Sequence, residues 1–161
     1  MSTFRKLSHL EEQLGDERFQ ALISSDNTGK VKEFCDELIQ SSIPTEMTVG
    51  GRTYDILGFL RGDEKLVVGP TMVERAREMN AHLGKDDSDH ILVYQEEIPV
   101  ALRNKVRFVF TDDRNPYYPE ACEIYWESDW ENDEDGYWNR RWGLIVPPRG
   151  WHGLYRVLRR K

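Results

Sequence analysis

The spacing of apolar residues changes along this chain, and that change constrains the fold more than any other feature. In the first forty residues, and again between about 72 and 97, apolar residues recur at intervals of three and four, which is typical of amphipathic helices. From residue 106 onward they alternate with polar residues, which is typical of strands with one buried face. Because helical segments come first and strands last, the pattern favours the α+β class. We predict N-terminal helices packed on a C-terminal antiparallel β-meander of about four strands.

Two helices are predicted in the first forty residues. Ser8 and Glu11 have the spacing of a capping box, which predicts a helix to about Ser24. Thr28 is placed to cap a second helix to about Gln40, whose apolar residues follow the helical repeat closely. Because only a short polar loop separates the two segments, we expect an antiparallel helix pair.

The middle of the chain mixes short strands and helices. The glycine pair in residues 49–52 predicts a hairpin turn within a small hairpin at about 47–55. A short strand is predicted at 65–68. Capping residues and apolar spacing then predict helices over 72–83, closed by a C-terminal glycine, and over 86–97.

Four segments after residue 105 alternate like strands, and turn-forming residues separate them. We predict a single domain over residues 1–161, with a mainly helical part at 1–105 and an antiparallel sheet part at 106–161. The residues that share a face within each predicted strand are Val106, Phe108 and Phe110; Cys122, Ile124 and Trp126; Trp138, Arg140, Trp142, Leu144 and Val146; and Leu154, Arg156 and Leu158.

Composition excludes several classes of protein. Hydrophobic residues make up 39% of the chain, which is too much for a disordered protein. The net charge of −7 excludes a uniformly basic nucleic-acid coat. No apolar run has the length of a membrane span, and the first residues fit neither a signal nor a transit peptide. We therefore expect a cytoplasmic protein without membrane contact, in which Cys35 and Cys122 are buried reduced thiols, and we predict no cofactor and no metal site.

The tryptophans mark the main candidate for a binding surface. All five lie at or after Trp126. Trp138, Arg140 and Trp142 alternate on one strand face, where a guanidinium can stack on two indole rings. This pattern permits two interpretations, a stacking platform for a ligand or partner, and a sheet face filled with core residues. Because Leu144 continues the same face, we expect that end of the strand to be covered.

Two loops extend this candidate surface. Residues 112–119 place two tyrosines between prolines, and residues 127–136 hold six acidic residues. The acidic loop resembles a calcium loop in part, but Trp142 stands where the bidentate glutamate belongs, so a solvated hairpin loop is the preferred interpretation. The predicted binding residues are Trp126, Trp130, Trp138, Arg140, Trp142, Tyr117 and Tyr118.

Three functions fit these features. The first is a non-enzymatic, cytosolic protein–protein interaction module whose partner is another protein or a second copy, because Trp, Tyr and Arg dominate interface energetics. The second is a small enzyme that uses His152 or His90 with a carboxylate such as Asp112 in a cleft between helices and sheet. The third is binding of phosphate or nucleic acid at the Arg-rich C-terminal end, residues 140–161. We do not expect nucleic acid as a partner, because intramolecular charge pairing explains those arginines equally well.

Overall fold

The computed structural model describes residues 43–112, 120–128, 136–145 and 150–161. All of them belong to one compact unit, Ile43–Lys161, with mixed helix and strand content. The predicted helices at 8–24 and 28–40 and Cys35 lie outside the described residues. Their packing on the sheet, and the single domain over 1–161, therefore stay predictions.

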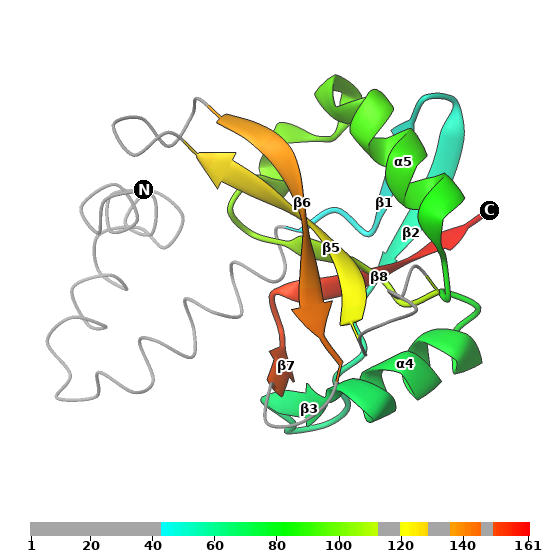
Figure 1. Cartoon of the computed structure of the whole chain (residues 1–161), viewed down its shortest axis with the longest axis vertical. Coiled ribbons are helices and arrows are strands. Elements are labelled where there is room, and N and C mark those ends of the chain that lie inside the picture. The colour runs from blue at the N-terminus through cyan, green and yellow to red at the C-terminus, as the bar shows by residue number, and fades with distance from the viewer. Residues whose placement is uncertain (1–42, 113–119, 129–135, 146–149) are drawn as a thin grey trace, which may run out of the picture. The chain divides into compact units, whose positions relative to one another are not determined.

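Six strands form one large, mostly antiparallel sheet in the order β1-β2-β8-β4-β5-β6 (Figure 1). Each neighbouring pair is antiparallel except β4 and β8, which run parallel. The strands are β1 (Glu46–Val49), β2 (Arg52–Leu57), β4 (Arg107–Phe110), β5 (Glu120–Ser128), β6 (Gly136–Leu144) and β8 (Tyr155–Arg160).

The predicted four-stranded meander is correct for β4, β5 and β6 and wrong for the last strand. β8 does not follow β6 in the sheet but lies between β2 and β4. The burial of β8 explains this position, because Tyr155 to Leu158 are buried without interruption. Side chains on both faces of a strand are covered most completely when strands flank it on both sides and other elements pack on both faces of the sheet, as at a central position.

The hairpin predicted near residues 47–55 is confirmed. β1 and β2 pair directly, with Val49 opposite Arg52, so that two residues form the turn. Those residues, Gly50 and Gly51, have φ angles of +54° and +74°. Positive φ at both central positions is the geometry of a type I′ turn, which glycine adopts without steric cost.

The remaining elements are short. The predicted strand at 65–68 is β3 (Leu66–Val68), which pairs with β7 (Gly150–His152) in a separate two-stranded sheet. The helices within residues 43–161 that the structure describes are α4 (Gly69–Glu78), α5 (Lys85–Val93) and two 3₁₀ turns, η1 (Gln95–Glu97) and η2 (Val100–Leu102).

Both α-helices end earlier than their sequence patterns predict. For α4 the residue in left-handed conformation after the helix is Asn80, with a φ of +54°, and not the glycine at position 84. Asparagine tolerates this conformation better than most residues and so terminates helices in the same way. After α5 the chain tightens into η1, and the prediction of one helix over 86–97 is wrong in its last turn.

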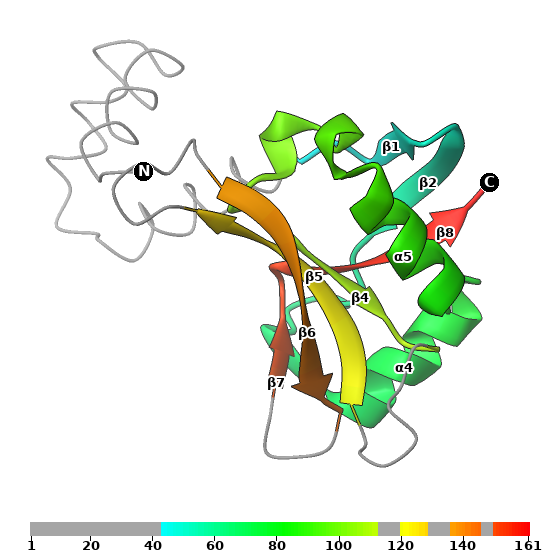
Figure 2. The same ribbon diagram turned by 45° about the horizontal axis from the view of Figure 1, so that its top comes forward.

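Two clusters of apolar side chains cover the two faces of the large sheet. Alternation along β4 directs Phe108 and Phe110 into one cluster, which includes Ile91 of α5. The same alternation directs Val109 into the other, with Met72 of α4. The sheet therefore lies between α5 on one face and α4 with β3 and β7 on the other (Figures 1 and 2). No helix in the described part of the chain is long and apolar enough to cross a membrane.

Candidate interaction surface

The tryptophans of the sheet occupy two different environments. Trp142 shares a face of β6 with Trp138, as predicted, and Trp126 lies directly opposite Trp138 in the β5–β6 register. Trp126 and Trp138 are 9% and 3% exposed, and their rings meet edge to face with centroids 5.8 Å apart. The ring of Phe108 stacks on Trp138 at 5.5 Å. These two indoles fill the core, whereas Trp142 is 42% exposed.

The covered end of this face is the opposite one from the end that the sequence indicates. Leu144, expected to lie under cover, is 43% exposed. The segment after α5 instead reaches the other end of β6, where the Gln95 side chain accepts a hydrogen bond from the backbone N–H of Trp138 at 3.0 Å. The strand therefore carries a buried half around Trp138 and an exposed half at Trp142 and Leu144.

The predicted stack of a guanidinium between two indoles is not formed by Arg140. Its guanidinium donates a hydrogen bond to Asp89 of α5. Hydrogen bonds from Lys85 and then from Arg140 hold the pKa of the Asp89 carboxyl below its ordinary value. The Trp126 ring is covered by Arg103 instead, with the guanidinium carbon 4.1 Å from the ring centroid. This cation–π contact closes the buried end of the face.

β6 is an edge strand, and its outward-facing backbone is only partly occupied. The N–H of Trp138 donates to Gln95, and that of Arg140 donates to the side-chain oxygen of Asn139 at 2.7 Å. Because N–H and C=O groups point to alternate sides along a strand, those of Trp142 and Leu144 also point away from β5. Among the described residues, no hydrogen-bond partner is seen for these two N–H groups.

The other arginine at this edge is paired on the opposite face of the sheet. Arg141 Nε donates to Glu123 Oε2 at 2.9 Å, and Arg107 Nη1 lies 3.8 Å from the same oxygen. Glu123 is fully buried, so this pairing compensates a charge that would otherwise be costly in the interior. Tyr125 lies beside both guanidinium groups, with its centroid 4.9 Å from Arg141 and 5.2 Å from Arg107.

The loop residues of the candidate surface are not placed. Tyr117, Tyr118 and Trp130 lie outside the described residues, as do most acids of the loop 127–136. The prediction that these loops extend the surface therefore stays a prediction. In the part of the chain that is described, no group of three or more His, Cys, Asp or Glu side chains is arranged to hold a metal ion.

The histidines do not make the contacts that the enzyme hypothesis predicts, in which His152 or His90 pairs with a carboxylate such as Asp112. His90 bonds the Val49 carbonyl oxygen at 3.0 Å, and His152 Nδ1 lies 3.5 Å from the backbone nitrogen of Leu154. Asp112 has a histidine neighbour, but it is His82, whose Nε2 lies 2.9 Å from Asp112 Oδ1.

This histidine also bonds a hydroxyl group. His82 Nδ1 lies 2.6 Å from Thr111 Oγ1, so the imidazole bridges a hydroxyl and a carboxylate. Such a series resembles a nucleophile with its base and acid, but Thr111 is fully buried, and a substrate could not reach its oxygen. Asp112 also donates its backbone N–H to the Leu83 carbonyl at 2.9 Å. We interpret the cluster as a clamp that fixes the α4–α5 connection to the end of β4.

The last three residues of the chain, all basic, pair with carboxylates of the chain. Arg159 bonds Asp55 at 2.7 Å, and Arg160 Nη1 lies 3.4 Å from Asp87. Lys161 pairs with Glu46 as well as with Asp55. These partners come from β1, β2 and α5, and they reduce the positive charge that a phosphate would meet.

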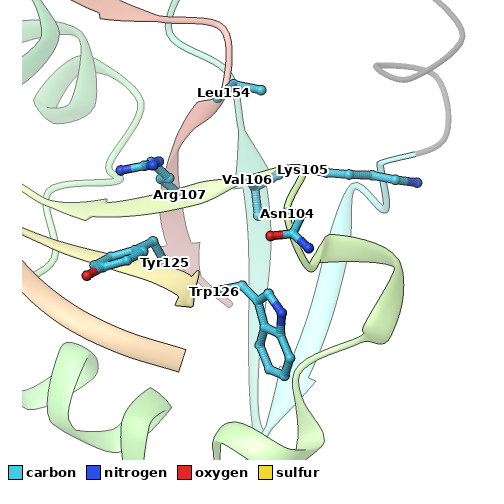
Figure 3. A pocket seen from close by; sticks show the side chains of 7 residues that line it. All are labelled: Asn104, Lys105, Val106, Arg107, Tyr125, Trp126 and Leu154. Atoms are coloured by element: carbon cyan, nitrogen blue, oxygen red, sulfur yellow. The ribbon is translucent and has the colours of Figure 1, made fainter. Parts of the chain in front are cut away.

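A small pocket at the start of β4 is lined by Asn104, Lys105, Val106, Arg107, Tyr125, Trp126 and Leu154 (Figure 3). Its polar side chains do not converge. Arg107 and Tyr125 extend to one side, whereas Lys105 extends to the other (Figure 3). A ligand site needs polar groups that point at a common centre, so this pocket gives no support to the enzyme hypothesis.

Comparison with known proteins adds no family to this description, because no family model, curated protein or solved structure matches the chain. The surface must be judged from its own geometry. Sequence reasoning had placed Trp142 in the surface and had missed Leu144, which alternation places beside it on the same face. Alternation alone carries no information about which end of a strand another element covers.

Proposed function

We propose that the chain is a non-enzymatic protein–protein interaction module that binds another polypeptide along the exposed half of β6. We call Trp142, Gly143 and Leu144 the β6 edge surface. The observation that carries the proposal is the exposure of Trp142 and Leu144, at 42% and 43%, on a strand at the edge of the sheet. The proposal keeps the predicted cytoplasmic location and the predicted packing of the N-terminal helices on the sheet.

Two properties of the β6 edge surface support binding of an extended segment. Its outward N–H and C=O groups offer main-chain hydrogen bonds, which give affinity when a strand is added to a sheet. Its side chains offer an indole and a branched aliphatic group on one face, and burying the exposed two-fifths of each contributes roughly 0.6–1.3 kcal/mol. Natural proteins protect sheet edges that must remain unpaired, often with a charged side chain that points inward. At this edge Arg140 and Arg141 are already paired with Asp89 and Glu123.

A site-specific photo-crosslinker tests the proposal in the full chain. A benzophenone amino acid at position 142 should form a covalent adduct with a polypeptide, because its ring would lie in the interface. The same amino acid at Val93 is the control, since Val93 is an exposed apolar residue of α5 away from β6. Leu144→Lys should remove the adduct at position 142, because the lysine charge would have to be desolvated on binding.

The outcomes separate clearly. An adduct that forms at 142, is absent at 93 and is lost with Leu144→Lys supports the proposal. Equal yields at both positions would indicate non-specific capture and contradict it. The absence of any adduct at 142 would also contradict it. The mass of the adduct identifies the partner, and titration of that purified partner against intrinsic tryptophan fluorescence then measures the affinity.

A further inference from the structure

We infer that the polypeptide paired with the β6 edge surface is a second copy of this chain, joined by an antiparallel β6–β6 contact with Gly143 opposite Gly143 of the second copy. This inference rests on the proposed function and names its partner. It would join the two large sheets through their β6 edges into one continuous sheet.

The first argument is the symmetry of the side chains. Trp142 and Leu144 flank a glycine and lie on the same face of β6. Two-fold pairing about Gly143 places Trp142 of each copy directly opposite Leu144 of the other. Opposed aromatic and aliphatic residues in an antiparallel pair contribute roughly 0.2–1 kcal/mol per pair relative to alanine, and this arrangement makes two such pairs.

The second argument is the direction of the backbone groups. The N–H groups of Trp138 and Arg140 point outward, so those of Trp142 and Leu144 do as well. In the proposed register, Trp142 of one copy and Leu144 of the other exchange two hydrogen bonds, and the symmetric pair exchanges two more. Gly143 is then the non-hydrogen-bonded pair, where strands approach most closely and where the absence of a side chain removes any obstacle.

The third argument is charge. In a two-fold symmetric contact, a charged residue near the axis lies close to the same residue of the second copy. Such a contact therefore disfavours edges that carry a charge at their centre. Here the Arg140 guanidinium is bonded to Asp89 and that of Arg141 to Glu123, so neither arginine at this edge lacks a carboxylate partner, although Asp89 is shared with Lys85 and Glu123 with Arg107. A register centred on Arg141 would place two arginines opposite each other. The register centred on Gly143 places Arg141 opposite Ile145 instead.

The contact is short, so the dimer should be weak. Interfaces below about 1,200 Å² of total buried area are typical of transient complexes. We therefore expect monomers at about 10 μM and a growing share of dimers toward about 1 mM. Sedimentation velocity of the full chain over this range should show a mass that rises from 19.0 kDa toward twice that value.

Amide exchange provides a test that needs no mutation. At high concentration, exchange of the Trp142 and Leu144 amides should slow by about tenfold when roughly nine-tenths of the chains are paired. The Arg141 and Gly143 amides point toward β5 and should not change with concentration. Leu144→Lys should abolish both the rise in mass and the protection, whereas the matched control Val93→Lys should abolish neither.

Two results would overturn the inference: a mass of 19.0 kDa at all concentrations, or a dimer that survives Leu144→Lys. A monomer that still forms the position-142 adduct with a different protein would refute the second copy and leave the proposed function standing. A monomer that forms no adduct would refute both.

Discussion

Replacing the two turn glycines one at a time would measure how tightly the β1–β2 hairpin packs on α5. Gly50 and Gly51 both have positive φ, so alanine at either position pays the same kind of conformational cost. Their surroundings differ. An added Cβ at Gly50 would overlap Tyr94 and lie 2.6 Å from His90 Nε2, whereas one at Gly51 has no neighbour within 4 Å. Gly51→Ala is therefore a matched control for Gly50→Ala.

The expected magnitudes follow from these contacts. The left-handed conformation costs alanine about 1–2 kcal/mol, and the reduced freedom of the unfolded chain offsets about 0.4–1 kcal/mol of this. Gly51→Ala should thus cost about 1 kcal/mol. Gly50→Ala must also displace Tyr94 and His90, and His90 donates to the Val49 carbonyl at 3.0 Å. Lost hydrogen bonding of about 0.5–1.5 kcal/mol and overpacking of about 1–3 kcal/mol raise the total to about 2.5–5.5 kcal/mol.

Urea denaturation followed by far-ultraviolet circular dichroism gives the free energy of unfolding of each variant. Gly50→Ala should lose about 1.5–4.5 kcal/mol more than Gly51→Ala, with an unchanged denaturant slope. If the two variants agree within about 0.5 kcal/mol, the turn does not pack against α5, and the reasoning from these contacts is refuted.

Three further predictions concern stability. Burial, and then the hydrogen bond to Asp87, raises the pKa of Tyr54 to about 12. A raised pKa gives stability that is complete below pH 10 and is lost as the pH rises toward 12. Urea denaturation across this range should show that the Tyr54→Phe variant lacks this alkaline loss of stability. The same variant should be about 1–2 kcal/mol less stable than the original chain at pH 7. The Arg75 guanidinium lowers the pKa of Glu64 to about 2 from 4.5. The contribution of the Glu64 carboxylate to the free energy of unfolding is therefore complete above pH 4.5 and is lost as the pH falls toward 2. Glu64→Gln should make the acid dependence of the melting temperature shallower, and an unchanged slope would contradict the pairing. Gly69→Ala would drive a Cβ into the backbone carbonyl of the residue after β6, so thermal melts should show a loss of more than about 3 kcal/mol.

Local patterns in the sequence were sufficient for the parts of the fold that depend on neighbours along the chain. Alternation placed Trp138 and Trp142 on one face of a strand, and the β5–β6 register bears this out. The pair Gly50–Gly51 predicted the hairpin, because few residues other than glycine adopt positive φ at both turn positions. Side-chain direction and turn conformation are set within a few residues, so the sequence carries them directly.

The sequence predicted less well where distant segments compete for the same position. The placement of β8 beside β4 depends on a parallel contact between residues almost fifty positions apart. Helix ends were also missed, because Asn80 terminates α4 before the glycine that the pattern favours. Neither feature has a strong local signal, since each depends on which of several acceptable arrangements buries the most apolar surface.

By itself, the sequence determined that this chain builds a tryptophan-bearing sheet whose arginines alternate with its indoles. Only the tertiary structure decided which tryptophans are core and which are surface. The segment after α5 covers the Trp138 half of β6, and Asp89 of α5 forms an ion pair with Arg140. Trp142 remains exposed at the edge of the sheet. The physical reason is that alternation fixes the face on which a side chain lies, whereas burial depends on the helix that packs over that face from a distant part of the chain.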